Sequence, residues 1–209
     1  MSDRPVLLRM SEVKKRYGKR EVLAIEEFEL AEGDRILLSG ANGSGKSTLL
    51  RILAGVTPIT NGRLERSPQL ASMVVGYVPQ AGGLYGDMTL RQNLAIYSRM
   101  YDTQPSRAAE EVWFVRDSSL KAFVDVPVGV MSGGIHQLAA FACVLSAGPQ
   151  ALLLDEPSSE LDSAHSGQIY EWLALLRDSM SFLIVSSHES RSFDFLNRHV
   201  RMEGGRVAS

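Results

Sequence analysis

Cysteine is almost absent from this sequence: Cys143 is the only one among 209 residues. One cysteine cannot form a disulfide within the chain, which excludes a disulfide-stapled fold and suits a reducing compartment. Long apolar runs are absent too, and the longest covers residues 138–145. Because a helix that spans a bilayer needs about 20 apolar residues, we expect no membrane-spanning segment. The N-terminus has no signal-peptide pattern, so we expect a cytoplasmic protein with Cys143 in its core.

The sequence also has no large excess of charge of either sign: it contains 22 basic and 24 acidic side chains, and its formal net charge is −2. Domains that bind nucleic acid usually carry a basic surface, so we expect no nucleic-acid partner. The basic residues between 14 and 20 form a local cluster, which we interpret as a solvated loop. The sequence has no internal repeat, and its length suits a single domain over 1–209 that carries a small inserted subdomain.

Among the features that are present, the most informative is the segment 40–47, which matches the phosphate-binding pattern G-x-x-x-x-G-K-[ST]. Its glycines allow backbone N–H groups to approach phosphate oxygens. Lys46 brings a positive charge to the β- and γ-phosphates, and the Ser47 hydroxyl is placed to bind Mg²⁺. A strand-like run over 35–39 precedes the segment and a helical pattern over 48–55 follows it. The sequence therefore predicts a site for a nucleoside triphosphate with Mg²⁺.

Apolar runs alternate with helical patterns along the rest of the chain, which is typical of an α/β fold with a largely parallel core. The predicted strands are 6–13, 22–30, 35–39, 74–78, 151–154 and 182–185. The predicted helices include 90–100 (capped by Thr89), 107–116 and 168–177, a hairpin is expected over 199–207, and 57–62 has the composition of a turn.

Two carboxylates follow the buried strand that begins at residue 151. The run 152–156 resembles a Walker B motif, in which Asp155 lies beside Mg²⁺ and Glu156 orients or deprotonates the attacking water. General-base catalysis of this kind contributes roughly 10²–10⁴-fold. Because ligands collect at the carboxyl ends of parallel strands, we expect the phosphate loop, this acidic pair and His188 to converge on one γ-phosphate.

With these motifs in their order, the chain resembles the nucleotide-binding subunit of an ATP-binding cassette (ABC) transporter from residue 6 to residue 207. The resemblance implies a P-loop NTPase core of mainly parallel sheet, an N-terminal antiparallel β subdomain and an inserted helical subdomain over about 81–131. It implies that ATP is bound by Tyr17, Gly40, Asn42, Gly43, Ser44, Gly45, Lys46, Ser47, Thr48 and Asp162, and across a dimer by Ser132, Gly133 and Gly134. It implies catalysis by Glu156, His188, Lys46 and Gln80, and Mg²⁺ ligands from Ser47, Gln80 and Asp155.

In this family two cassettes stack head to tail, and the signature motif of one, here 131–134, covers the ATP of the other. The resemblance therefore implies a homodimer or heterodimer of cassettes that hydrolyses ATP. It also implies an integral membrane permease as a separate subunit, with this chain peripheral at the inner face of the cell membrane. The segment 83–94 looks more like exporter-type cassettes. The alternative is a soluble cassette that acts on a non-membrane partner, such as an iron–sulfur assembly complex.

The signature region departs from the family pattern in three places. Ile135 stands where glutamine is usual, and Leu138 and Cys143 stand where arginine is usual. Glu160 also replaces the usual alanine of the D-loop, 159–162. Isoleucine cannot form a hydrogen bond, so one contact to the partner cassette is expected to be lost.

We predict that ATP hydrolysis is slower than is usual for the family, or depends on a partner subunit. A hydrogen bond to a charged group is worth about 1.5–3 kcal/mol. The substitution Ile135→Gln should therefore raise turnover in a steady-state ATPase assay. Unchanged turnover together with unchanged ATP affinity would remove this explanation.

Overall fold

The computed structural model describes residues 4–80, 83–100, 115, 118–158, 161–187 and 195–208, and within α6 only the backbone of residue 163. Its strands are β1 (Val6–Tyr17), β2 (Arg20–Ala31), β3 (Arg35–Ser39), β4 (Asn61–Arg66), β5 (Val75–Val78), β6 (Ala151–Asp155), β7 (Phe182–Ser187), β8 (Arg198–Glu203) and β9 (Arg206–Ala208). Its α-helices are α1 (Lys46–Leu53), α2 (Pro68–Ala71), α3 (Leu90–Met100), α5 (Gly133–Ser146) and α6 (Ser163–Leu176). Short 3-10 turns are η2 (Ser119–Phe123), η3 (Val128–Val130) and η4 (Arg177–Ser179).

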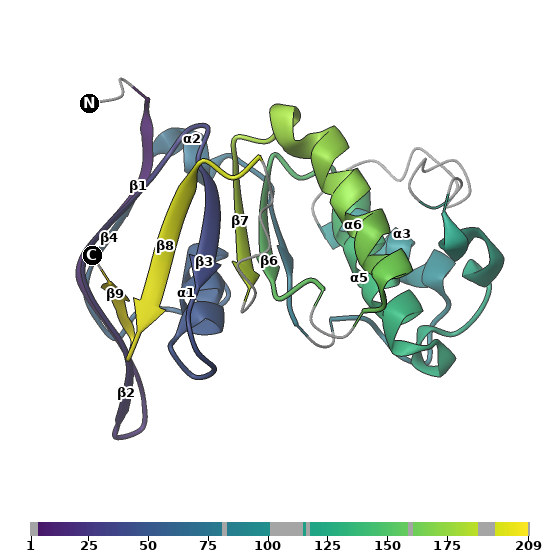
Figure 1. Ribbon diagram of the computed structural model, residues 1–209, viewed down its shortest axis with the longest axis horizontal. Coiled ribbons are helices and arrows are strands. Elements are labelled where there is room, and N and C mark those ends of the chain that lie inside the picture. The colour runs from purple at the N-terminus through teal and green to yellow at the C-terminus, as the bar shows by residue number, and fades with distance from the viewer. Residues whose placement is uncertain are drawn as a thin grey trace. The chain divides into compact units, whose positions relative to one another are not determined.

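The strands form two sheets (Figure 1). One is a three-stranded antiparallel sheet in the order β2-β1-β4. The other has six strands in the order β5-β6-β7-β3-β8-β9. Within it, β6, β7, β3 and β8 pair in parallel, and β9 returns antiparallel to β8. Parallel strands run in the same direction, so their carboxyl ends lie at one edge of the sheet. Polar residues that follow different strands therefore meet at this edge.

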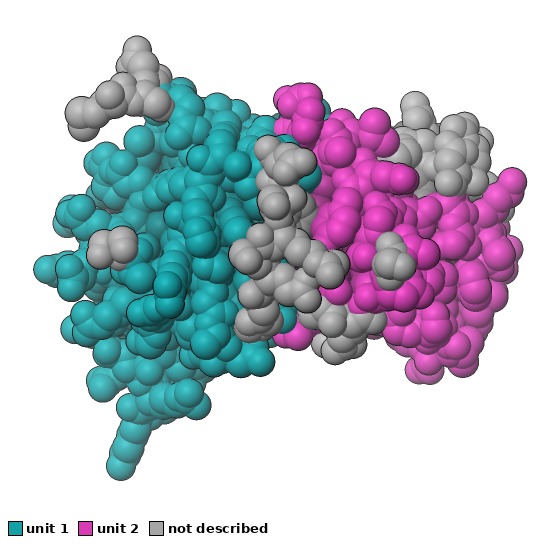
Figure 2. Space-filling model, viewed as in Figure 1, with its two compact units in different colours: residues 1–77, 150–156, 179–209 teal, residues 78–149, 157–178 magenta. Residues whose placement is uncertain are grey.

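The chain divides into two compact units, which Figure 2 distinguishes by colour. The first unit contains residues 1–77, 150–156 and 179–209, and the second contains 78–149 and 157–178. The core of the first unit draws on both sheets and on α1, with fully buried side chains such as Leu8, Leu50 and Ile184. Burial of each such side chain contributes roughly 1.5–3 kcal/mol. The predicted boundaries of the inserted subdomain, 81–131, stay a prediction.

The second unit is built around α5, which contacts both α3 and α6. Nine of the helix's residues are buried, and the Phe141 ring stacks on Trp172 of α6 with their centroids 5.7 Å apart. Leu138 and Cys143, which stand at two usual arginine positions, are fully buried in this helix. Burial raises the pKa of the Cys143 thiol, so it stays protonated and unreactive at neutral pH.

The helix over 90–100 begins as its sequence predicts. The Thr89 hydroxyl accepts from the Gln92 N–H at 3.2 Å, while the Gln92 side chain accepts from the Thr89 N–H at 2.9 Å. This reciprocal pair satisfies two donors at the helix start and fixes its first residue. The predicted helix over 107–116 lies outside the described residues, apart from residue 115.

Candidate nucleotide-binding site

The predicted phosphate loop joins the carboxyl end of β3 to α1. Gly40, Gly43 and Gly45 have φ values of 146°, 77° and 104°, which residues with a side chain rarely adopt. A Cβ atom on Gly40 would lie 2.3 Å from the Met202 carbonyl oxygen, and one on Gly45 would lie 2.7 Å from Leu23 Cδ2. The loop therefore needs glycine for its backbone conformation at all three positions and for close packing at two of them.

Lys46 is the first residue of α1, and its side chain is only 4% exposed. Its Nζ donates to the carbonyl oxygens of Gly40 at 2.8 Å and Ala41 at 3.3 Å. The same Nζ lies 3.4 Å from Glu156 Oε1. Because solvent screens such a buried pair weakly, the two charges interact strongly. The predicted phosphate-binding cation and the predicted catalytic base are thus neighbours.

Ser44 provides a test of whether the loop fits a triphosphate. Its side chain is 5% exposed, and its Oγ has no hydrogen-bond partner among the described residues. A buried polar group without a partner costs about 1–3 kcal/mol. A phosphate oxygen would satisfy this hydroxyl and the N–H groups at the start of α1. The loop therefore fits a triphosphate.

Asp155 ends β6 with 2% exposure. Its Oδ1 accepts from the Ser186 hydroxyl at 2.8 Å, and its Oδ2 lies 3.5 Å from the Tyr77 hydroxyl. Burial raises the pKa of Tyr77, an effect that a hydrogen bond from Arg51 opposes. The phenol therefore stays protonated at neutral pH, where it can donate to the carboxylate.

The donors near Asp155 suit Mg²⁺, which prefers oxygen ligands and usually takes only one or two carboxylates together with phosphate oxygens. Asp155 supplies a carboxylate and Ser47, in the first turn of α1, supplies a hydroxyl. Within the described ranges, no group of three or more His, Cys, Asp or Glu side chains is arranged to hold a metal by itself. The residues therefore fit a metal that arrives with a triphosphate.

Glu156 has an unusual backbone conformation for a residue with a side chain. Its φ is 50°, in the left-handed region, which costs roughly 1–2 kcal/mol for such a residue. Its N–H donates to Ser186 Oγ at 2.9 Å, and the residue is 8% exposed. Strained residues of this kind cluster at functional sites, which agrees with the predicted catalytic role.

Tyr17, the predicted adenine-stacking residue, lies at the end of β1 with 48% of its surface exposed. The Lys15 ammonium lies 4.8 Å from its ring centroid and donates to the Pro58 carbonyl oxygen at 2.8 Å. The cation therefore holds the ring through a cation–π contact, while the exposed surface of the ring is accessible to a stacked base.

The second unit holds the other predicted binding residues. Gln80 follows β5 and is exposed. Ser132 precedes α5 in an extended conformation, so Gly133 and Gly134 form the helix's first turn. Asp162 caps α6 by accepting from the His165 N–H at 2.9 Å. Hydrogen bonds from His165 lower the pKa of the Asp162 carboxyl, which is therefore ionised at neutral pH.

Some expectations fall outside the described residues: His188, and the D-loop positions 159 and 160. The sequence analysis missed Ser186 and Tyr77, both of which contact Asp155. The two serines that end the strand 182–187, directly before His188, were the available signal for Ser186. Ile135 is only 7% exposed. The Ile135→Gln substitution would therefore bury an amide, and its turnover must be measured beside a melting curve.

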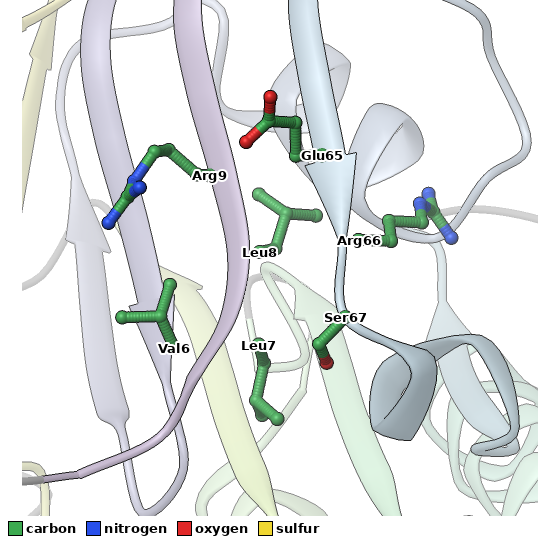
Figure 3. Close-up of a pocket in the computed structure, with 7 residues that line it drawn as sticks. All are labelled: Val6, Leu7, Leu8, Arg9, Glu65, Arg66 and Ser67. Atoms are coloured by element: carbon green, nitrogen blue, oxygen red, sulfur yellow. The ribbon is translucent and has the colours of Figure 1, made fainter.

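A pocket of about 250 Å³ opens beside β1 and β4 and contains none of the predicted site residues (Figure 3). Its lining residues are Val6, Leu7, Leu8, Arg9, Glu65, Arg66 and Ser67. Arg66 reaches α1 instead, where it donates to the carbonyl oxygens of Ile52 and Leu53, both at 3.1 Å. A positive charge at a helix C-terminus is favourable, so Arg66 stabilises the helix that begins at Lys46.

A family model described as ABC transporter matches residues 24–159 of the chain. The chain belongs to the ABC transporter family. Over 206 residues the cassette is 32% identical to the zinc import ATP-binding protein ZnuC of Halorhodospira halophila, covering 97% of this chain and 76% of that protein. It is also 32% identical to the Nod factor export ATP-binding protein I of Sinorhizobium fredii, covering 96% of this chain but only 61% of that protein.

The fold of the cassette is shared with solved structures. A dimeric ATP-binding cassette in a post-hydrolysis state with ADP and Pi matches with a TM-score of 0.82 at 22% identity, covering 97% of each chain. The predicted P-loop α/β fold, with its antiparallel and mainly parallel sheets, is confirmed. The prediction of an ATP-binding, ATP-hydrolysing subunit of the transporter type is confirmed by the family. No helix in the described part of the chain is both long and apolar enough to cross a bilayer.

The glycines of the loop yield a testable prediction about ATP binding. Gly40→Ala should weaken ATP affinity tenfold or more, since a loss of about 1.4 kcal/mol is tenfold in a binding constant and its Cβ would meet the Met202 carbonyl. Gly148→Ala is the control, because the φ of Gly148 is also positive and its Cβ would meet nothing within 4 Å, but it lies outside the phosphate loop. Equilibrium titration with a fluorescent ATP analogue measures both. Equal losses in the two variants would contradict the packing argument.

Proposed function

We propose that this cassette is the cytoplasmic ATPase subunit of a transporter. It binds a separate integral membrane permease at the inner face of the membrane and drives transport through it. The convergence of Lys46, Asp155 and Glu156 beyond the carboxyl ends of β3 and β6 supports the ATPase activity, and the likeness to ATP-binding proteins of import and export systems supports the role in transport. The two relatives above are named as import and export proteins, so both directions of transport occur among similar chains.

In the proposed reaction, the triphosphate lies in the loop 40–47 with Lys46 beside its β- and γ-phosphates. Ser47 and Asp155 would hold Mg²⁺, which would supply positive charge to neutralise the phosphates. Glu156 accepts a proton from a water molecule as the water oxygen bonds to the γ-phosphorus. The bond from that phosphorus to the bridging oxygen breaks, giving ADP and inorganic phosphate. Lys46 lies 3.4 Å from Glu156, so an incoming triphosphate competes for the lysine and releases the carboxylate to act as base.

The proposal includes a second cassette, identical or different. Ser132, Gly133 and Gly134 would cover the ATP of that cassette, because a helix N-terminus with a serine hydroxyl attracts phosphate. The start of α5 has this form. One solved cassette of the same fold is dimeric. Gln80 and His188 would sense and hold the γ-phosphate, and Gln80 would also reach Mg²⁺.

Co-purification tests the permease. A tagged chain is expressed in its native host, the membranes are extracted in mild detergent, and proteins that bind the chain are identified by mass spectrometry. A multi-spanning membrane protein is the expected partner. Recovery only from the soluble fraction, with soluble partners such as iron–sulfur assembly proteins, would overturn the transporter proposal.

Glu156→Gln should abolish the general base while keeping the size of the side chain. We predict a fall in turnover of about 10²-fold or more with ATP still bound, and a stable ATP-bound dimer on size-exclusion chromatography. Glu65→Gln, an exposed position on β4, is the control and should keep the parental rate. Parental hydrolysis by Glu156→Gln would show that the base is assigned to the wrong residue.

A further inference from the structure

Ser186 directly follows the apolar residues of β7, and it is fully buried. Its hydroxyl donates its one proton to Asp155 Oδ1 at 2.8 Å and accepts the Glu156 N–H at 2.9 Å. A serine hydroxyl has one donor and two acceptor sites. A single buried side chain therefore contacts both carboxylate residues of the proposed site at once.

The pairing of two strands creates this contact. In the parallel register of β6 and β7, Asp155 is the direct partner of Ser186, and the two strands lie side by side in Figure 1. Paired residues of neighbouring strands point to the same face of a sheet. The strand pairing itself therefore places the serine hydroxyl beside the carboxylate of Asp155.

Glu156 follows directly and leaves the sheet with a φ of 50°. A left-handed conformation of a residue with a side chain persists only where its surroundings fix it. The hydrogen bond from the Glu156 N–H to Ser186 Oγ is such a constraint. Because φ of Glu156 determines where its side chain begins, this bond helps to set the position of the carboxylate near Lys46.

We propose that Ser186 is a positioning residue for ATP hydrolysis, whose hydroxyl fixes the Asp155 carboxylate and the left-handed turn at Glu156 together. It acts through these two residues and does not touch the nucleotide. The inference rests on the roles assigned to Asp155 and Glu156 under the proposed function. A displacement of a catalytic group by about 1 Å can cost 10²-fold in rate, and partners that orient metal ligands typically contribute 10–100-fold.

The test compares Ser186→Ala, Ser186→Thr and Ser186→Val in the full chain. Threonine and valine have nearly the same shape but differ in the hydroxyl, so this pair isolates the hydrogen bonds even if the alanine variant fails to fold. Val185→Ala, at the buried neighbouring position of β7, controls for the stability of the strand. The readouts are kcat, KM for ATP, the Mg²⁺ concentration at half-maximal rate, and the melting temperature.

Ser186→Ala and Ser186→Val should lower kcat about 10–100-fold, change KM for ATP by less than about threefold, and raise the half-saturating Mg²⁺ concentration severalfold. Ser186→Thr should recover most of the rate. Val185→Ala should lower the melting temperature and keep kcat within about twofold. Equal rates for the threonine and valine variants would overturn the inference. So would a fall in the kcat of Ser186→Ala that is fully explained by a smaller fraction of folded protein.

Glu156→Gln, assayed in parallel, separates this inference from the proposed function. An inactive Glu156→Gln beside a fully active Ser186→Ala overturns only the positioning role. Parental activity of Glu156→Gln overturns the assignment of the base, whatever the serine variants do.

Discussion

The parallel pairing of β7 with a strand on each side is the interaction on which the rest of the site depends. On one side Ser39 of β3 is the partner of Ser187, and on the other Asp155 of β6 is the partner of Ser186. These residues all stand at the carboxyl ends of their strands. The phosphate loop and the acidic pair, far apart in the sequence, therefore begin from one edge of the sheet, where ligands of such sheets bind.

The C-terminal hairpin supports the same edge from the next strand. The Met202 carbonyl of β8 leaves room only for glycine at position 40. In the turn between β8 and β9, the Gly205 N–H donates to the Ser44 carbonyl oxygen at 3.0 Å, while the Gly205 carbonyl oxygen accepts from the Ala24 N–H at 2.8 Å. Backbone bonds thus tie the phosphate loop to β2 and to the hairpin, which keeps its N–H groups in place for an anion.

Much of this arrangement could be predicted from the sequence, because buried parallel strands are short apolar runs. The strand expected at 35–39 has those bounds, and that expected at 151–154 extends by one residue. β4 was missed: its residues are almost all exposed and polar, and only pairing with β1 makes it a strand. The contacts of Ser186 could not be predicted either, since they depend on the register between β6 and β7.

The helix α5, which follows the signature motif, could likewise be predicted only in part. The motif and the start of the helix can be recognised in the sequence, but the burial of Ile135 depends on how α5 packs in the second unit. A substitution that looks like a lost surface contact is then also a change in the core. Leu138 and Cys143 are also buried in the core, so apolar packing takes the place of the arginines that the family pattern has at these two positions.

The central claim is that the ends of β3, β6 and β7 form one site for Mg²⁺ and ATP. A crystal structure of the chain with Mg²⁺ and a non-hydrolysable ATP analogue tests it most directly. We predict a triphosphate in the loop 40–47, with Lys46 Nζ moved from Glu156 to the phosphates and Asp155 beside the metal. A nucleotide bound elsewhere, or Lys46 still paired with Glu156 beside a bound triphosphate, would contradict the account.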